Sequence, residues 1–244
     1  MTFMTAETNA APVVNGQACW SCGDMRASQF CTSCGKVQPP QPVDYFTFFG
    51  LPRKLNLDVS ALEREFYAMS RKLHPDIYAG RDSKEQEWSL EQSSRLNDAY
   101  RTLKDPVRRT EYLLKLEGVE FEGQSKAATE EARKTGQQKQ IVPPDLLEEV
   151  FELNLQLEQL RAEKKLGEED PGLVSELQQH KAALEGKFSA LFEELQGYWD
   201  QWDAAEEARN DSAKEAARDK MVDVLNRRSY IRNLVRDVNE ALSS

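Results

Sequence analysis

Apolar residues recur with the period of an α-helix at two places in the first half of the chain. The first stripe, at positions i, i+4, i+7 and i+11, consists of Leu62, Phe66, Met69 and Leu73. The second stripe, at positions i, i+3, i+4 and i+7, consists of Leu96, Ala99, Tyr100 and Leu103. Each spacing places its residues on one helical face. The pattern therefore predicts two amphipathic helices, joined by a polar loop.

Polar caps and prolines mark the ends of these helices. Asp58 or Ser60 can cap the first helix, because short polar side chains accept hydrogen bonds from the first free N–H groups. This helix must end at His74, since Pro75 disfavours helical geometry in the residue before it. Asp105, followed by a proline, can cap a further short helix. This half of the chain is thus predicted to be a set of short and medium helices.

The last hundred residues consist mostly of helix-forming residues with longer apolar stripes. They predict helices at roughly 144–166, 171–205 and 208–242, separated by breaks at Gly167 and near Trp202–Glu206. Each helix exceeds 20 residues, and an antiparallel three-helix bundle is the economical way to bury such stripes. The preceding stretch, 119–143, lacks a sustained stripe and is predicted to be a loose linker or a weakly packed helix. The fold class is therefore all-α.

Composition and charge exclude several classes of function. The chain has 244 residues and a net charge of −10, and residues 145–244 carry the whole excess, with 23 acidic and 13 basic side chains. So acidic a region argues against nucleic-acid binding. No apolar run approaches the roughly 18 residues that a membrane span needs. Because residues 1–17 contain no Lys or Arg, they resemble neither a secretory signal nor a transit peptide, and a cytoplasmic location is predicted.

Four cysteines form a compact metal-binding pattern. Cys19-x2-Cys22 is followed after eight residues by Cys31-x2-Cys34, and a glycine after each pair permits a tight turn. Four thiolates make a closed structural site for Zn²⁺, and iron fits the same ligand set. Disulfides or free thiols are the alternative, and a redox role is disfavoured because a thioredoxin-like βαβ setting is absent. The prediction is a small zinc-ribbon-like knuckle that metal binding stabilises.

Two aromatic residues, Trp20 and Phe30, lie beside the cysteines. Large aromatic rings contribute much of the buried area at contacts between domains and between proteins. Either ring could dock the knuckle onto the following domain or mediate weak self-association, and the sequence leaves both open.

The triplet His74-Pro75-Asp76 follows an amphipathic helix and precedes a loop and a second helix. With this context, Asp44 to about Gly118 resembles the J-domain family. That resemblance implies that the loop and the preceding helix dock on a DnaK/HscA-type chaperone and stimulate its ATPase. An exposed aspartate can pair with a partner arginine, while basic side chains steer association with an acidic surface. The implied chaperone-binding residues are His74, Pro75, Asp76, Arg64, Arg71 and Lys72.

The triplet could also have a purely structural role instead of a role in chaperone binding. His74 could simply end a helix while Asp76 caps the loop. A catalytic role is disfavoured, because no nucleophile pattern lies nearby and the second histidine, His180, lies in a polar helix. The chain is therefore predicted not to be an enzyme.

A J-domain joined to a helical C-terminal domain, with no Gly/Phe-rich stretch, resembles the HscB-type (Jac-type) co-chaperones of iron–sulfur cluster biogenesis. The N-terminal cysteine knuckle matches the longer members of that family, which carry such a segment. The resemblance implies binding of an IscU-type scaffold protein through an apolar patch on the C-terminal domain. The implied residues are Leu147, Glu148, Phe151, Glu152, Leu155 and Tyr230. Leu155 departs from the acidic residue common at its position.

Two alternatives remain open at this point. Phe151 could pack on the next helix instead of facing a partner, because apolar stripes are usually core. The client of the J-domain could also be a different protein. The predicted organisation is a disordered N-terminus (1–18), the knuckle (19–38), the J-domain (44–118), the linker (119–143) and the scaffold-binding domain (144–244).

Overall fold

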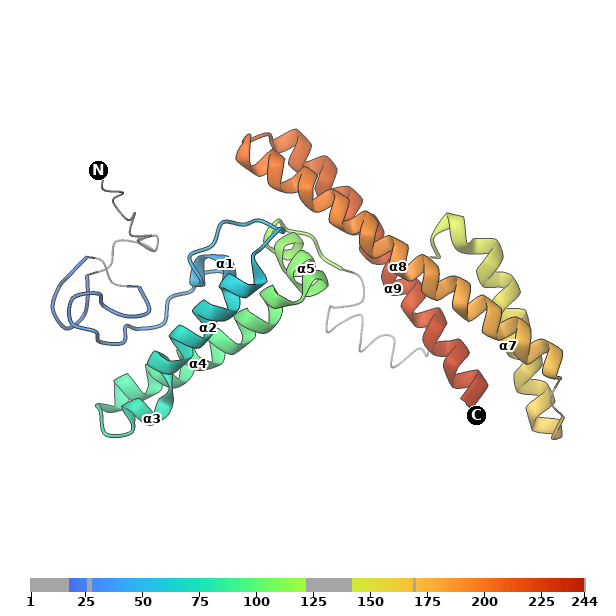
Figure 1. The fold of residues 1–244 in the computed structure, drawn as a ribbon, viewed down its shortest axis with the longest axis horizontal. Helices are drawn as coiled ribbons and strands as arrows, with labels where there is room; N and C mark the ends of the chain where they lie inside the picture. Colours follow the sequence, from blue (N-terminus) through green and yellow to red (C-terminus); the bar gives the residue numbers. More distant parts are fainter. Residues whose placement is uncertain (1–17, 26–27, 122–141, 169, 244) are drawn as a thin grey trace, which may run out of the picture. The chain divides into compact units, whose positions relative to one another are not determined.

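The fold is described from a computed structural model, which describes residues 18–25, 28–121, 142–168 and 170–243 (Figure 1). The chain forms two compact units, Met1–Leu113 and Leu114–Ser244. The predicted disordered segment 1–18 and the predicted linker 119–143 lie almost wholly outside the described residues.

The first unit is built around a helical hairpin, as the sequence predicts. It contains α1 (Tyr45–Phe48), α2 (Val59–Leu73), α3 (Pro75–Tyr78), α4 (Ser83–Lys104) and most of α5 (Pro106–Leu116). The helices α2 and α4 lie side by side (Figure 1) and bury the predicted stripes against each other. Phe66 and Tyr100 stack at that contact, with ring centroids 4.1 Å apart.

The short helix α3 stands where the sequence predicted only a polar loop. Pro75 occupies its first position, where the missing N–H costs nothing and the fixed φ suits a helix. Ile77 N donates to His74 O at 3.0 Å, which closes the first turn. The prediction failed here because four residues are too few to show a helical period.

Aspartate side chains cap the helices of this unit. Asp58 accepts from Ala61 N at 3.0 Å, so it is this residue and not Ser60 that caps α2. Asp105 likewise accepts a hydrogen bond from Arg108 N at 2.9 Å and caps α5, as predicted. Asp44 accepts from Thr47 N at 2.9 Å, and Asp82 from Lys84 N at 2.9 Å. Each cap satisfies one of the donors that a helix start leaves free.

The second unit consists of long helices packed together, and it confirms the predicted fold class. It contains a 3₁₀ turn η1 (Pro144–Leu146), α7 (Leu147–Leu166), α8 (Pro171–Glu207) and α9 (Asp211–Ser243). Gly167, with a φ of 76°, ends α7 as predicted. The bounds differ from the predicted ones by three residues or fewer, mainly because the first predicted helix opens with a 3₁₀ turn.

Two contacts fix the direction of α7 within this bundle. Arg227 of α9 pairs with Asp145 at 2.8 Å, and Lys164 Nζ donates to Ala241 O at 2.9 Å. Lys164 follows Asp145 in the chain, and its partner Ala241 likewise follows Arg227. The helices α7 and α9 therefore run parallel, and α8 runs antiparallel to each. Because α7 is much shorter than its neighbours, it lies beside only part of them (Figure 1).

Candidate functional sites

His74-Pro75-Asp76 forms the corner between α2 and α3. His74, with a φ of −59° and a ψ of 127°, ends α2, and its Nδ1 accepts from Asp76 N at 3.3 Å to cap α3. His74 therefore does end a helix, which is the structural role that the sequence allowed for it. The side chain of Asp76 is 90% exposed, with Oδ2 3.5 Å from His74 Nδ1. The corner thus presents a carboxylate to solvent from a backbone fixed by a proline and a cap.

Hydrogen bonds from side chains of α3 and α4 hold this corner in place. Ser89 Oγ and Ser93 Oγ of α4 each donate to Leu73 O at 2.7 Å. Tyr78 Oη of α3 donates to Lys72 O at 3.1 Å. These bonds satisfy the last carbonyls of α2, which a helix end leaves without partners. The corner is consequently anchored on two helices as well as on its own backbone.

The basic residues of α2 are accessible, and two of them lie in the last turn before the corner. Arg64, Arg71 and Lys72 are all exposed. Glu63, which could dilute their charge, accepts instead from Tyr100 Oη at 2.8 Å and from Lys104 Nζ at 3.4 Å. These hydrogen bonds lower the pKa of the Glu63 carboxyl, and the bond from Tyr100 has the largest effect. Glu63 is therefore engaged on the α4 side.

An exposed apolar patch runs along α7. It consists of Leu147, Phe151 and Leu155, which are 54%, 67% and 53% exposed. Their spacing of four residues places them on one stripe. A separate stripe of α7 supplies the bundle core with Val150, Leu153, Leu157 and Leu160. Phe151 is thus not packed on the next helix, and three large apolar side chains face solvent together.

Charged residues flank the patch and fix the start of α7. Glu148 and Glu152 are exposed beside it. At the other side of the helix, Glu149 pairs with Lys187 of α8, in addition to the Arg227–Asp145 pair. The fixed helix start holds the patch in one orientation on the bundle. Tyr230 of α9 is half-buried, and burial, followed by the charge of Asp237, raises the pKa of its hydroxyl.

The four cysteine sulfurs converge in the knuckle. All four Sγ atoms lie within 4.8 Å of one another, with Cys19–Cys34 at 3.6 Å and Cys22–Cys31 at 3.5 Å. A tetrahedral site with metal–sulfur bonds of about 2.3 Å has edges of about 3.8 Å, whereas a disulfide needs about 2.05 Å. The separations fit four thiolates around one metal ion and do not fit disulfides.

The backbone of the knuckle is built from two similar turns. Gly23 N donates to Cys19 O and Gly35 N to Cys31 O, both at 2.9 Å, and both glycines adopt the left-handed conformation. Burial raises the pKa of the Cys19 thiol, but backbone N–H donors outweigh it and lower that pKa to about 6. Backbone N–H groups thus favour the thiolate form of Cys19, whereas the pKa of the Cys22 thiol in the same cluster is raised.

Comparison with known proteins identifies the J-domain. Residues 44–112 match the family model of the DnaJ domain. An Arabidopsis thaliana protein, "Iron-sulfur cluster co-chaperone protein HscB homolog", is 36% identical over 140 residues, which cover 57% of this chain and 50% of that protein. The mouse "Iron-sulfur cluster co-chaperone protein HscB" is 38% identical over 109 residues, or 42% of this chain and 47% of the mouse protein. Residues 44–112 therefore form a J-domain, and the chain is similar to HscB-type co-chaperones. The aligned regions span about half the length of these relatives.

A solved structure extends the likeness in fold. The crystal structure of the human co-chaperone protein HscB superposes with a TM-score of 0.58, at 23% sequence identity, over 92% of this chain and 98% of the human one. The chain combines a J-domain with a four-cysteine cluster, as the sequence resemblance predicted. The names of these relatives describe co-chaperones, in line with the prediction that the chain is not an enzyme.

The knuckle docks on the J-domain, which is one of the two roles that the sequence allowed for its aromatic residues. Trp20 meets Trp88 of α4 edge to face, with centroids 5.6 Å apart. The ammonium of Lys72 lies 5.9 Å from the centre of the Phe30 ring. Gln29 Nε2 donates to Phe48 O of α1 at 2.7 Å. The knuckle therefore contacts α1, α2 and α4.

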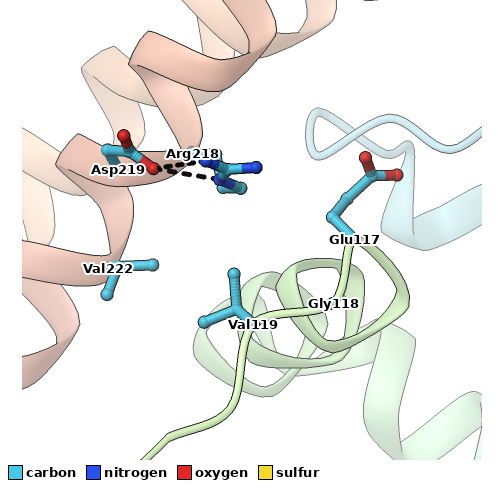
Figure 2. Close-up of a pocket in the computed structure, with 6 residues that line it drawn as sticks. All are labelled: Glu117, Gly118, Val119, Arg218, Asp219 and Val222. Atoms are coloured by element: carbon cyan, nitrogen blue, oxygen red, sulfur yellow. Dashed lines mark hydrogen bonds and ion pairs between the residues drawn. The ribbon is translucent and has the colours of Figure 1, made fainter.

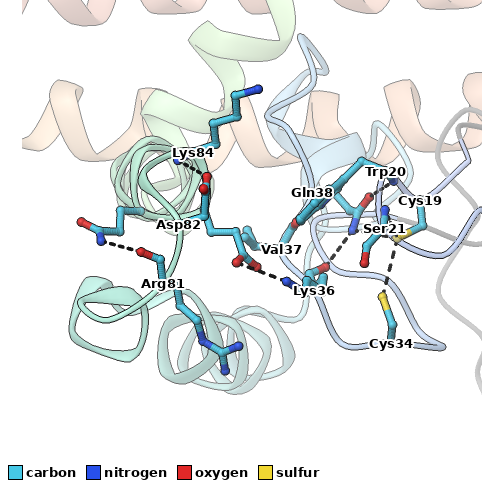
Figure 3. Close-up of polar contacts among 12 residues, drawn as sticks. Cys19, Trp20, Ser21, Cys34, Lys36, Val37, Gln38, Arg81, Asp82 and Lys84 are labelled. Atoms are coloured by element: carbon cyan, nitrogen blue, oxygen red, sulfur yellow. Dashed lines mark hydrogen bonds and ion pairs between the residues drawn. The ribbon is translucent and has the colours of Figure 1, made fainter.

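Sequence reasoning missed the polar residues at this contact (Figure 3). Lys36 and Gln38, labelled in Figure 3, take part: Lys36 pairs with Glu85 at 3.3 Å, and Gln38 O accepts from Gln92 Nε2 at 2.7 Å. Glu85 and Gln92 are buried on α4, where they continue the apolar stripe towards the start of the helix. Their polar character at positions of the apolar stripe was the signal that could have revealed the contact, because a buried polar group requires a polar partner.

The second unit of the chain has an open pocket (Figure 2). Its lining residues are Glu117, Gly118, Val119, Arg218, Asp219 and Val222. The Arg218 guanidinium already pairs with Asp219 at 2.9 Å and with Glu215 at 3.1 Å, so its charge is satisfied within α9. Across the part of the chain that the structure describes, no helix combines the length and the apolar character of a membrane span.

Proposed function

We propose that this chain stimulates the ATPase of a DnaK/HscA-type chaperone through His74-Pro75-Asp76 and delivers an IscU-type iron–sulfur scaffold protein to it. The observation that carries the proposal is the accessible Asp76 carboxylate at the anchored corner of a J-domain. The printed names of the relatives, which describe iron–sulfur cluster co-chaperones, support the choice of client.

The chaperone-binding step uses the corner and the basic residues of α2. An arginine of the chaperone can form a charge-assisted pair with Asp76, which the cap of His74 and the ring of Pro75 hold in direction. Arg64, Arg71 and Lys72 steer the encounter with an acidic chaperone surface and fix its register. Their exposure next to the corner supports this assignment.

The client-binding step uses the apolar patch on α7. Exposed large apolar side chains in a contiguous stripe are typical of a protein interface, and a rim of charge adds specificity. Glu148 and Glu152 supply that rim, and Tyr230 contributes from α9. An acidic rim suits a partly basic partner. Chaperone and client therefore bind to separate units of the chain.

The four cysteines hold a structural zinc ion in this proposal. Cys19, Cys22, Cys31 and Cys34 supply all four ligands, so the ion has no open position for catalysis. A bound zinc ion holds the two turns of the knuckle together, since so small a segment lacks a hydrophobic core. Iron would fit the same thiolates.

The proposal is tested by measuring ATP hydrolysis by the chaperone with the chain and an IscU-type scaffold, separately and together. Stimulation by the chain alone is expected, with a larger rate when the scaffold is added. If the scaffold changes nothing and does not bind, the J-domain serves a different client. The cytoplasmic location stays a prediction from the sequence, and fractionation of cells tests it.

Replacing Cys31 with serine should remove the metal. A hydroxyl is a poor ligand for Zn²⁺ beside three thiolates, so the metal content should fall from about one ion per chain to near zero. The midpoint of thermal unfolding of the first unit should fall by at least about 5 °C, as expected for a loss of about 1 kcal/mol in a domain of this size. Elemental analysis and calorimetry measure the two effects.

Thr32→Ala is the matched control, because Thr32 is exposed between the same cysteines. It should retain the metal and the unfolding midpoint. A full equivalent of tightly bound metal in Cys31→Ser would contradict the four-thiolate site.

A further inference from the structure

A buried carboxylate lies nine residues after Asp76 of the His74-Pro75-Asp76 corner. Glu85 is in the first turn of α4 and is only 4% exposed. Burying a carboxylate is costly unless a cation and hydrogen bonds compensate it. The compensating cation comes from the knuckle, where Lys36 Nζ lies 3.3 Å from Glu85 Oε2 (Figure 3). A charge of the J-domain is thus balanced by a different segment of the chain.

Glu85 is close to the groups that anchor the corner. Burial, followed by the charge of Glu85, raises the pKa of the Tyr78 hydroxyl, which places Glu85 within electrostatic reach of that ring. The same hydroxyl donates to Lys72 O at 3.1 Å. Ser89, one turn after Glu85, donates to Leu73 O at 2.7 Å. The start of α4, where Glu85 lies, therefore carries the Ser89 support of the corner and lies close to the Tyr78 support on α3.

The knuckle holds Lys36 on both sides. Its carbonyl accepts from Cys31 N at 2.9 Å and from Gln38 Nε2 at 2.8 Å. Its ammonium lies 5.0 Å from the centre of the Trp20 ring. Because Cys31 is also one of the four clustered cysteines, the backbone of Lys36 is tied to the metal-binding turn.

We propose that Lys36 is a positioning residue for chaperone binding: the knuckle supplies its ammonium to Glu85 and so holds the start of α4, and with it the corner that presents Asp76. This inference rests on the proposed function of the corner. It gives the knuckle a role in the J-domain's activity in addition to its own stability. Without Lys36, Glu85 regains solvation by moving the first turn of α4 outwards, and the anchors at Tyr78 and Ser89 move with it.

A double-mutant cycle on the full chain tests the proposal. Lys36→Met retains most of the side-chain length and removes the charge, Glu85→Gln removes the buried charge, and the third variant combines both. The readouts are the concentration of the chain that gives half-maximal stimulation of the chaperone ATPase, the maximal rate, and the metal content. Lys36→Arg is the conservative variant.

Lys36→Met should raise the half-maximal concentration about fivefold, the upper end for a partly exposed ion pair, and leave the maximal rate unchanged. Lys36→Arg should restore it. In the double variant, the half-maximal concentration should return to that of Glu85→Gln, because no buried charge remains to be compensated. Metal content equal to wild type in each variant shows that the knuckle is intact.

Two results would overturn the inference. One is a wild-type half-maximal concentration for Lys36→Met, and the other is a double variant no better than Lys36→Met. If Lys36→Met loses its metal or unfolds, the comparison of Glu85→Gln with the double variant decides, and a difference between them counts against the proposal. If Asp76→Ala stimulates normally, it is the proposed function that has failed.

Discussion

Replacing Asp76 with alanine should abolish stimulation of the chaperone ATPase and leave scaffold binding unchanged. The carboxylate is 90% exposed, so its removal creates no cavity and breaks no buried contact. The cap of α3 also survives, because it uses the backbone N–H of residue 76 and His74 Nδ1. What is lost is a charge-assisted contact with the chaperone, worth about 2–5 kcal/mol when the partner charge is left buried, or at least about thirtyfold in binding.

The measurement is the steady-state rate of ATP hydrolysis against the concentration of the chain, with scaffold affinity determined separately by calorimetry. Glu91→Ala is the control, since Glu91 is an exposed acidic residue of α4 in the same unit. It should stimulate as the wild type does. Normal stimulation by Asp76→Ala would mean that the corner does not act on the ATPase, and the proposed mechanism would be wrong.

The helices could be predicted because their stripes are long and their caps use standard residues. The stripe from Leu62 to Leu73 is buried as expected, apart from the partly exposed Phe66, and Asp58 and Asp105 cap the helices that they were expected to cap. The start of α4 is different. Glu85, Ser89 and Gln92 occupy the same face as Leu96, but they are polar, so a search for apolar periodicity stops before them.

The partners of these polar residues explain why periodicity alone could not place them. Ser89 bonds to the last carbonyl of α2, while Glu85 and Gln92 bond to the knuckle, which lies more than 45 residues earlier in the chain. A local pattern shows that such residues are on a core face, but it does not identify a distant partner. The docking of the knuckle is therefore visible only in the structure.

The apolar patch was ambiguous in the sequence for a related reason. Phe151 is adjacent to Val150 and extends the stripe of α7, and a wider stripe can mean either a larger core or an exposed surface. The helix has a neighbour on only part of its circumference, so Val150 is buried and Phe151 is 67% exposed. The exposure of these residues makes the patch open to a direct test.

The double variant Leu147→Ala/Phe151→Ala should lose scaffold binding and retain ATPase stimulation in the absence of the scaffold. Both side chains are exposed in the chain alone, so their truncation should leave the unfolding midpoint of the bundle unchanged. Their full burial against a partner would contribute about 1.5–3 kcal/mol each. Loss of roughly 3 kcal/mol weakens binding about a hundredfold, which titration calorimetry with an IscU-type scaffold measures directly.

The chain offers a close control in Leu166→Ala, at the far end of the same helix. Leu166 is 76% exposed and equally apolar, but lies outside the patch. If scaffold binding depends on this particular stripe, Leu166→Ala should bind as the wild type does, and Tyr230→Ala should weaken binding less than the double variant, because its ring is already half-buried in the bundle. Equal losses for Leu166→Ala and the patch variant would indicate non-specific apolar contact. Unchanged binding by Leu147→Ala/Phe151→Ala would remove the patch from the client interface, while the role of Asp76 would stand on its own test.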